Sequence, residues 1–90
     1  MTVYMVSYNL FDINDYADLW RELKRLGAFR AQECCWLVNV DMSAKRLHGQ
    51  LTSVADPDDR IWVMELTGNR CYSNAKRGTI EWLLENPTSR

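Results

Sequence analysis

Few side chains in this 90-residue sequence are spaced for familiar catalytic or metal chemistry. His48 is the only histidine, and the three cysteines include no Cys-x-x-Cys pair, so a structural zinc site is not expected. Cys34 and Cys35 are adjacent, and neighbouring residues on a strand point to opposite faces of a sheet. Their apolar surroundings predict buried free thiols rather than a disulfide framework or a reactive pair.

Other motifs with a known chemistry are also missing. The four glycines are scattered, so no phosphate-binding loop is present, and one histidine without a nucleophile turn indicates no hydrolase triad. Asp56, Asp58 and Asp59 lack the further ligands of a calcium loop. Because Pro57 and its Asp neighbours favour tight reversals, a solvated turn is the better interpretation. We therefore expect no metal or other cofactor.

Lysine and arginine residues remain as candidates for binding. The net charge is −1 and the pI is near 5.7, so a polyanion would have to bind a local basic patch. The alternative is that these cations are ordinary surface charges, paired with Asp18, Glu22 and Glu81. The candidates are Arg21, Lys24, Arg25 and Arg30 around the end of the first predicted helix, and Arg70, Lys76 and Arg77 in a polar segment near the C-terminus.

The strands that must position these residues are recognisable by their period of two. Residues 2–10, TVYMVSYNL, are apolar on both faces, which predicts a central strand that is covered on both sides. Residues 29–40 also alternate, and their length predicts a bend or a break into two strands near residues 32–34. Residues 60–67, RIWVMELT, form the last predicted strand.

Apolar residues at helical spacing predict three helices between and after the strands. Asp12 or Asn14 caps the first helix and Ser43 caps the second, because short polar side chains accept unpaired backbone N–H groups. Gly27 ends the first helix. The predicted buried stripes are Tyr16, Leu19, Trp20, Leu23 and Leu26 in the first helix and Ala44, Leu47, Leu51 and Val54 in the second, and the third helix contains Ile80, Trp82, Leu83 and Leu84.

This order of elements predicts one α+β domain over residues 1–90, in which residues 86–90 form a frayed tail. A ferredoxin-like, split βαβ sandwich with an extra short C-terminal helix fits the order best. The helices of such a fold cover one face of the sheet, yet the strands are apolar on both faces. Because a large open apolar face is unusual on a monomer, we expect a homodimer through a sheet face or edge.

The expected compartment is the cytoplasm. The N-terminus shows neither a basic leader nor a small-residue cleavage site, and its first apolar run stops before Asp12. No stretch approaches the roughly 18 apolar residues of a membrane span. Free cysteines also suit a reducing environment. We therefore expect no membrane partner.

Four stretches, in this order, resemble the CRISPR-associated Cas-two family, the smaller partner in spacer acquisition. They are VYMVSYNL, LKRLGAFRAQECCWLV, SAKRLHGQL and DPDDRIWVMEL, and together they cover about residues 3–67. The resemblance is nearest to the small proteins that are often labelled SinR-like. That label implies no repressor here, because the sequence contains no helix-turn-helix pattern.

The resemblance implies a homodimer and a place to look for a metal. In the enzymes of the family, an Asp at the end of the first strand binds a divalent cation near the dimer interface. Position 9 matches that Asp, and here it is Asn9. An amide brings no charge, and hard cations prefer carboxylates, so two Asn9 residues would hold Mg²⁺ or Mn²⁺ poorly. Asp12 is a possible substitute ligand, although capping the first helix explains it better.

Three functions remain open from the sequence. The first is a non-catalytic Cas-two-like homodimer that binds nucleic acid or a protein partner. The second is a metal-dependent endonuclease acting on RNA or DNA, with Asn9 and Asp12 as its site residues. The third is an inhibitor or antitoxin-like interaction subunit, which the slightly acidic pI permits. We expect the first.

Overall fold

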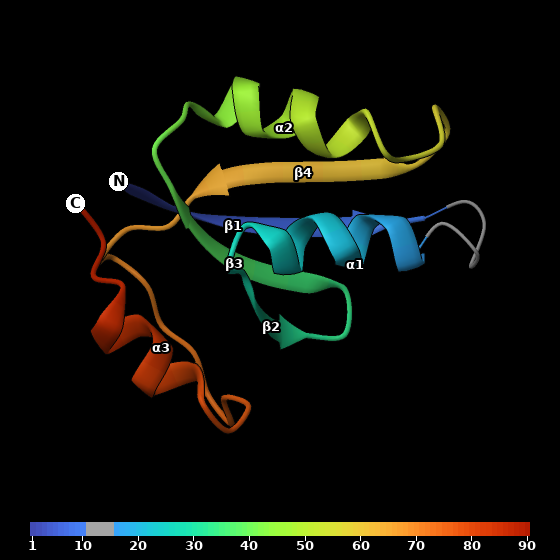
Figure 1. Ribbon diagram of the computed structural model, residues 1–90. Helices are drawn as coiled ribbons and strands as arrows, with labels where there is room; N and C mark the ends of the chain where they lie inside the picture. The colour runs from blue at the N-terminus through green and yellow to red at the C-terminus, as the bar shows by residue number, and fades with distance from the viewer. Residues whose placement is uncertain (11–15) are drawn as a thin grey trace.

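The computed structural model describes residues 1–10 and 16–90, and these form an antiparallel sheet with three helices (Figure 1). The sheet has the strand order β2-β3-β1-β4, and every neighbouring pair is antiparallel. The α+β prediction is confirmed, and the arrangement fits a ferredoxin-like type. The elements are β1 (Thr2–Asn9), α1 (Tyr16–Arg25), β2 (Phe29–Gln32), β3 (Cys35–Val40), α2 (Ala44–Thr52), β4 (Arg60–Glu65) and α3 (Thr79–Glu85).

Local sequence signals explain where most elements begin and end. The predicted break falls between β2 and β3, which are separated by two residues and joined with an irregular register. Gly27 follows α1 with a φ of 77°, a conformation that glycine adopts at little cost. The Ser43 hydroxyl accepts the backbone N–H of Arg46 at 3.1 Å and caps α2, as predicted. The predicted caps of α1, Asp12 and Asn14, lie outside the described residues.

The main core lies between one face of the sheet and the helices α1 and α2. Alternate residues of β1 point into it, because successive side chains of a strand face opposite ways. The four leucines that the helices contribute are fully buried: Leu19, Leu23, Leu47 and Leu51. Val54 was expected in this stripe, but it is exposed because α2 ends at Thr52. None of the described helices has the length and apolar character needed to cross a membrane.

Tyr8 joins three elements at the end of this core. Its hydroxyl accepts the indole N–H of Trp20 at 2.6 Å and that of Trp36 at 2.9 Å. The same hydroxyl donates to the backbone carbonyl of Glu33 at 3.3 Å. A tyrosine hydroxyl has one donor and two acceptor sites, so all three are used. The contact fixes α1 and the β2–β3 turn against β1.

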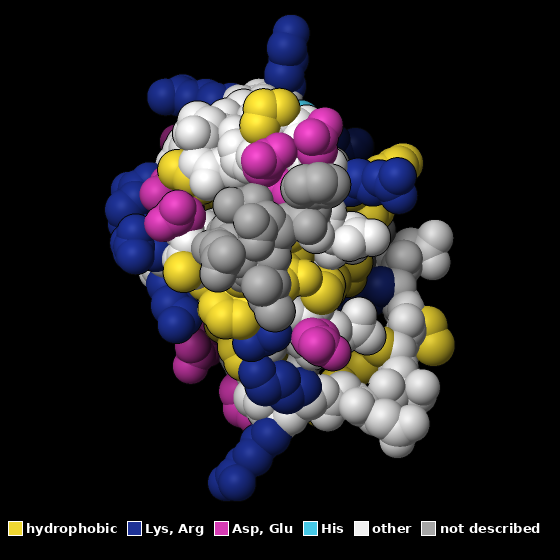
Figure 2. Space-filling view, turned by 90° about the vertical axis from the view of Figure 1, so that its right-hand side faces the viewer, with side chains coloured by type: hydrophobic (Ala, Val, Ile, Leu, Met, Phe, Trp, Pro, Cys, Tyr) yellow, Lys and Arg dark blue, Asp and Glu magenta, His cyan; other side chains and the backbone are white. Residues whose placement is uncertain are grey.

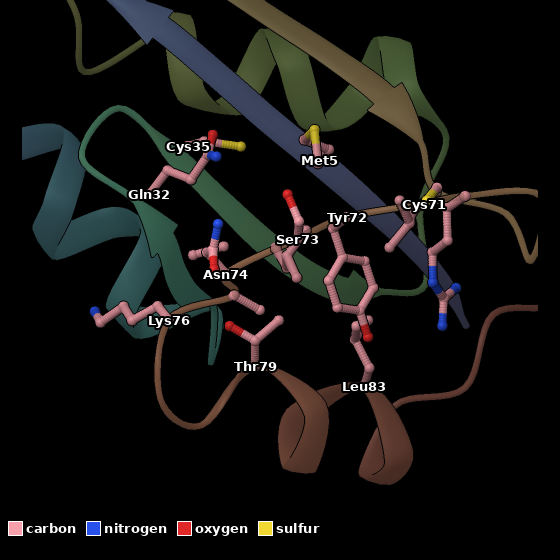
Figure 3. Close-up of a pocket in the computed structure, with 15 residues that line it drawn as sticks. Met5, Gln32, Cys35, Cys71, Tyr72, Ser73, Asn74, Lys76, Thr79 and Leu83 are labelled. Carbon is pink, nitrogen blue, oxygen red and sulfur yellow. The ribbon is translucent and has the colours of Figure 1, made fainter.

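The opposite face of the sheet, called here the second face, is covered in part by the chain itself. After β4 the chain crosses this face, and α3 packs there, with the Trp82 ring stacked on Phe29 at 6.3 Å. Figure 3 looks onto this face, with α1 and α2 behind the sheet. The expectation that the helices all lie on the same face of the sheet is therefore wrong for α3. The reason is that Leu83 completes an apolar surface that β1 and β3 present on that side.

The coverage of the second face stops short of β4. Trp62 and Met64 pair in register with Ser7 and Met5, so their side chains lie on the second face. They are 69% and 44% exposed. The far edge of β4 is also without a neighbouring strand in the described sheet. The outer side of α3 adds two further exposed apolar residues, Ile80 and Leu84.

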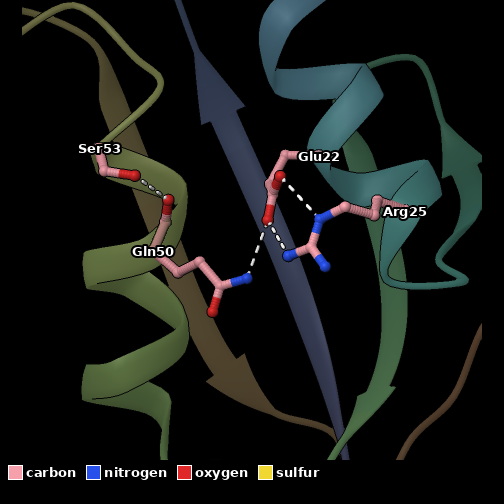
Figure 4. Close-up of polar contacts among 4 residues, drawn as sticks. All are labelled: Glu22, Arg25, Gln50 and Ser53. Atoms are coloured by element: carbon pink, nitrogen blue, oxygen red, sulfur yellow. Dashed lines mark hydrogen bonds and ion pairs between the residues drawn. The ribbon is translucent and has the colours of Figure 1, made fainter.

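A polar contact links α1 to α2 above the core (Figure 4). The Glu22 carboxylate accepts from the Arg25 guanidinium, with one contact of 3.1 Å, and from the Gln50 amide at 2.8 Å. These hydrogen bonds, first from Arg25 and then from Gln50, lower the pKa of Glu22 below its usual value of 4.5. Hydrogen bonds to the charged form favour that form.

The Glu22 contact predicts an acid-sensitive part of the stability. A lowered folded-state pKa stabilises the protein fully above the unfolded value, and this stabilisation is lost as the pH falls through the folded-state pKa. Between pH 7 and pH 3, the urea concentration at the midpoint of unfolding should therefore fall less for Glu22→Gln than for the unmodified chain. Asp18→Asn is the matched control, because the pair of Asp18 with Arg21 is exposed. Equal acid sensitivity in Glu22→Gln and the unmodified chain would contradict the assignment.

Candidate functional site

The edge of β2 carries a cation on each side, and each cation lies over an aromatic ring. On the side of α1, the Arg30 guanidinium lies 4.5 Å from the centre of the Trp20 ring. The Arg30 side chain also donates to the carbonyl of Glu33, at 3.1 and 2.8 Å, which fixes its plane. Lys24 lines a hollow beside Trp20, one helical turn further along α1.

On the second face, Lys76 occupies the equivalent place. Its ammonium lies 5.5 Å from the centre of the Phe29 ring and donates to the backbone carbonyl of Arg30 at 3.0 Å. This hydrogen bond brings two cations that are 46 positions apart in the sequence to the same strand. We call the group Trp20, Lys24, Phe29, Arg30 and Lys76 the β2-edge surface.

The other predicted cations have different surroundings. Arg21 pairs with Asp18 at 3.1 Å, and Arg25 pairs with Glu22, as the alternative of ordinary surface pairs expects. Arg70 donates to the carbonyl of Thr67 at 3.1 Å and to the Thr88 hydroxyl at 3.5 Å. Arg77 is exposed, and no ion pair holds it within residues 1–10 and 16–90.

The charge distribution agrees with a local site rather than a basic face. In Figure 2, Lys and Arg side chains lie around the visible face with Asp and Glu side chains among them. A mixed surface of this kind produces no strong field at long range. Any attraction for a polyanion must therefore come from cations in close contact with it, and the β2-edge surface holds three.

The end of β1 forms a polar corner with little net charge. Asn9 is exposed and stands opposite Arg60 in the sheet register. The two residues line a shallow hollow together with Leu10 and Asp58. Asp12 lies outside the described residues. Among the described residues, no three His, Cys, Asp or Glu side chains are grouped closely enough to hold a metal ion.

The remaining candidate groups have structural explanations. Cys35 is buried as predicted, whereas Cys34, which was predicted to be buried as well, is half-buried. Burial, followed by the effect of neighbouring Cys34, raises the pKa of the Cys35 thiol. A raised pKa disfavours the thiolate, which is the reactive form. Cys71, in contrast, is exposed. His48 is exposed on α2. In the predicted acidic turn, Asp56 accepts the backbone N–H of Asp58 at 2.9 Å.

Sequence reasoning identified the cations of the β2-edge surface but missed their aromatic partners. Trp20 was assigned to the buried stripe of the first helix, and its indole edge is indeed packed, but one ring face meets Arg30. For Phe29, the sequence pattern predicted only a place in a strand and gave no indication of a cation partner. Its contact with Lys76 depends on the path of residues 66–78 across the sheet. No model of a known protein family matches the chain.

Proposed function

We propose that the chain is a non-catalytic, Cas-two-like module that forms a homodimer and binds single-stranded nucleic acid at the β2-edge surface. One observation carries the binding proposal: Arg30 and Lys76, on opposite sides of the same edge strand, both lie over aromatic rings. Proteins recognise single strands by pairing cations with stacking platforms.

The geometry favours single strands over duplexes. The Arg30 guanidinium lies on Trp20 and is fixed by Glu33, so its outer plane is a platform on which a base can stack. Lys24 and Lys76 flank this platform and supply charge for phosphates. A duplex hides its base faces within the stack and requires a longer row of cations. The small number of cations predicts weak, salt-sensitive binding.

The dimer is proposed from the part of the second face that α3 leaves open. Trp62 and Met64 form an exposed apolar strip along an unpaired edge strand. Such an edge invites pairing with another chain unless it is blocked. The β2 edge is blocked in this way, because Lys76 donates to one of its carbonyls. A second copy that meets β4 would leave both β2-edge surfaces free.

The binding proposal is tested by the salt dependence of affinity for a labelled 20-nucleotide single strand. Each phosphate contact that is lost should reduce the slope of log affinity against log salt by about 0.7 for a single strand. Lys24→Gln combined with Lys76→Gln should therefore flatten the slope by about 1.4. The matched control is Lys45→Gln with Arg46→Gln on α2, which removes the same charge elsewhere and should leave the slope nearly unchanged.

Two results would contradict the proposal. Equal slopes for both double variants would show that the attraction is not localised at β2, and a protein partner would then be the better hypothesis. Cleavage of the strand in the presence of Mg²⁺ or Mn²⁺ would show that the chain is an enzyme. That result would favour the endonuclease alternative.

A further inference from the structure

A pocket lies between the second face of the sheet and the chain that follows β4, and the proposed function has not used it. Its volume is about 260 Å³. The apolar lining comes from Met5, Cys35 and Leu37 on the sheet and from Leu83 on α3 (Figure 3). A cavity of about 150 Å³ holds benzene, and pockets for drug-sized ligands begin near 300 Å³. The pocket therefore fits one small ring system.

Polar groups surround this apolar lining. Figure 3 shows Gln32 and Asn74 on one side of the pocket, with Tyr72 on the other. The two amides each offer a donor and an acceptor. Thr79 is only 7% exposed, and its hydroxyl has no hydrogen-bond partner among residues 1–10 and 16–90. A buried hydroxyl without a partner is costly. Its oxygen exposes less than 1 Å², so a ligand in the pocket reaches it only when the Thr79 side chain rotates, and the new hydrogen bond then relieves that cost.

The pocket shares one residue, Lys76, with the β2-edge surface. Lys76 lines the pocket and also lies over Phe29 beside the carbonyl of Arg30. Arg70 lines the pocket as well, so two cations border an apolar cavity. A ring with hydrogen-bonding edges that is joined to a phosphate matches this combination. We propose that the pocket receives one nucleobase, with its phosphate near Lys76, an inference that rests on the proposed function.

In this arrangement the strand passes over the β2 edge, so that one base stacks on the Arg30 platform on the α1 side and a neighbouring base enters the pocket on the second face. The base lies against the apolar lining, its edge meets the amides of Gln32 and Asn74, and the Thr79 hydroxyl gains a partner. Base edges become available in this way only in single strands, which is why proteins read sequence there. The same chemistry would also admit a free nucleoside monophosphate.

Two substitutions remove pocket chemistry while keeping the backbone. Thr79→Val replaces the hydroxyl with a methyl group of similar size. Asn74 has a φ of 54°, a left-handed conformation, so Asn74→Gly removes the amide without strain. Each variant should weaken base binding about 5- to 10-fold, the usual effect of one lost hydrogen bond. Thr79→Val should also raise the thermal midpoint of the ligand-free protein, because the unpaired hydroxyl is gone.

The experiment is an amide NMR titration with each of the four nucleoside monophosphates, with a 12-nucleotide single strand, and with the same strand carrying central abasic positions. The expected result is shifts over residues 71–79, weaker binding by both variants, and loss of those shifts with the abasic strand. Shifts with monophosphates but not with strands would keep the base pocket and contradict the proposed strand binding. Strand binding that is unaffected by both variants and by abasic positions would contradict base binding in the pocket, while strand binding at the β2-edge surface would still be supported.

Discussion

Tyr8→Phe removes one hydroxyl group and is expected to destabilise the protein by about 3 kcal/mol. This is the largest effect expected from the loss of a single hydroxyl in this chain. The lost hydroxyl accepts from two indole N–H groups and donates to one carbonyl. A buried donor that is left without a partner costs about 1–3 kcal/mol. Trp36 is 3% exposed, so water cannot replace the hydroxyl there without a rearrangement. For a domain of this size, the thermal midpoint should fall by on the order of 15 °C.

Tyr4→Phe provides the matched control. Tyr4 is as buried as Tyr8, but within residues 1–10 and 16–90 its hydroxyl makes one hydrogen bond, to the Met42 carbonyl at 2.8 Å. Its loss should cost only about 1 kcal/mol, near the mean for a single hydrogen bond. Urea unfolding of the two variants measures the difference directly. Equal destabilisation would show that the Tyr8 hydroxyl does not join the three elements as described.

Trp62→Lys with Met64→Lys is expected to convert the proposed homodimer into a monomer. The unmodified chain should scatter light at micromolar concentration as a particle of twice 10.6 kDa, and the variant as a particle of 10.6 kDa. A two-fold interface repeats each substitution, so four lysines replace four apolar side chains. Central aromatic residues carry much of the energy of an interface, so the dissociation constant should rise about 100-fold or more.

The design separates dimer loss from unfolding. Trp62 and Met64 are exposed in the single chain, so the double variant should keep the circular dichroism spectrum of the folded protein. Val54→Lys is the control, because it places lysine at an exposed apolar position beside α2. That variant should remain a dimer. A 10.6 kDa particle for the unmodified chain would contradict the dimer outright.

The sequence by itself determined the kind and order of the elements. The two apolar faces of residues 2–10 predicted a central strand, and β1 is hydrogen-bonded on both sides. Gly27 and Ser43 marked the helix ends because their roles depend on backbone conformation and on a local hydrogen bond, which neighbouring residues decide. The cations near the first helix and in the C-terminal segment were likewise visible from their types alone.

Only the tertiary structure decided which of these residues meet. Lys76 and Arg30 come together because residues 66–78 cross the second face, and no local pattern specifies that path. The same crossing turns Leu83 inward, leaves Ile80 and Leu84 exposed, and forms one wall of the pocket. The crossing segment and α3 cover the second face over β3, whereas Trp62 on β4 stays exposed. Periodicity shows that a face is apolar, whereas what covers that face depends on contacts between residues far apart in the chain.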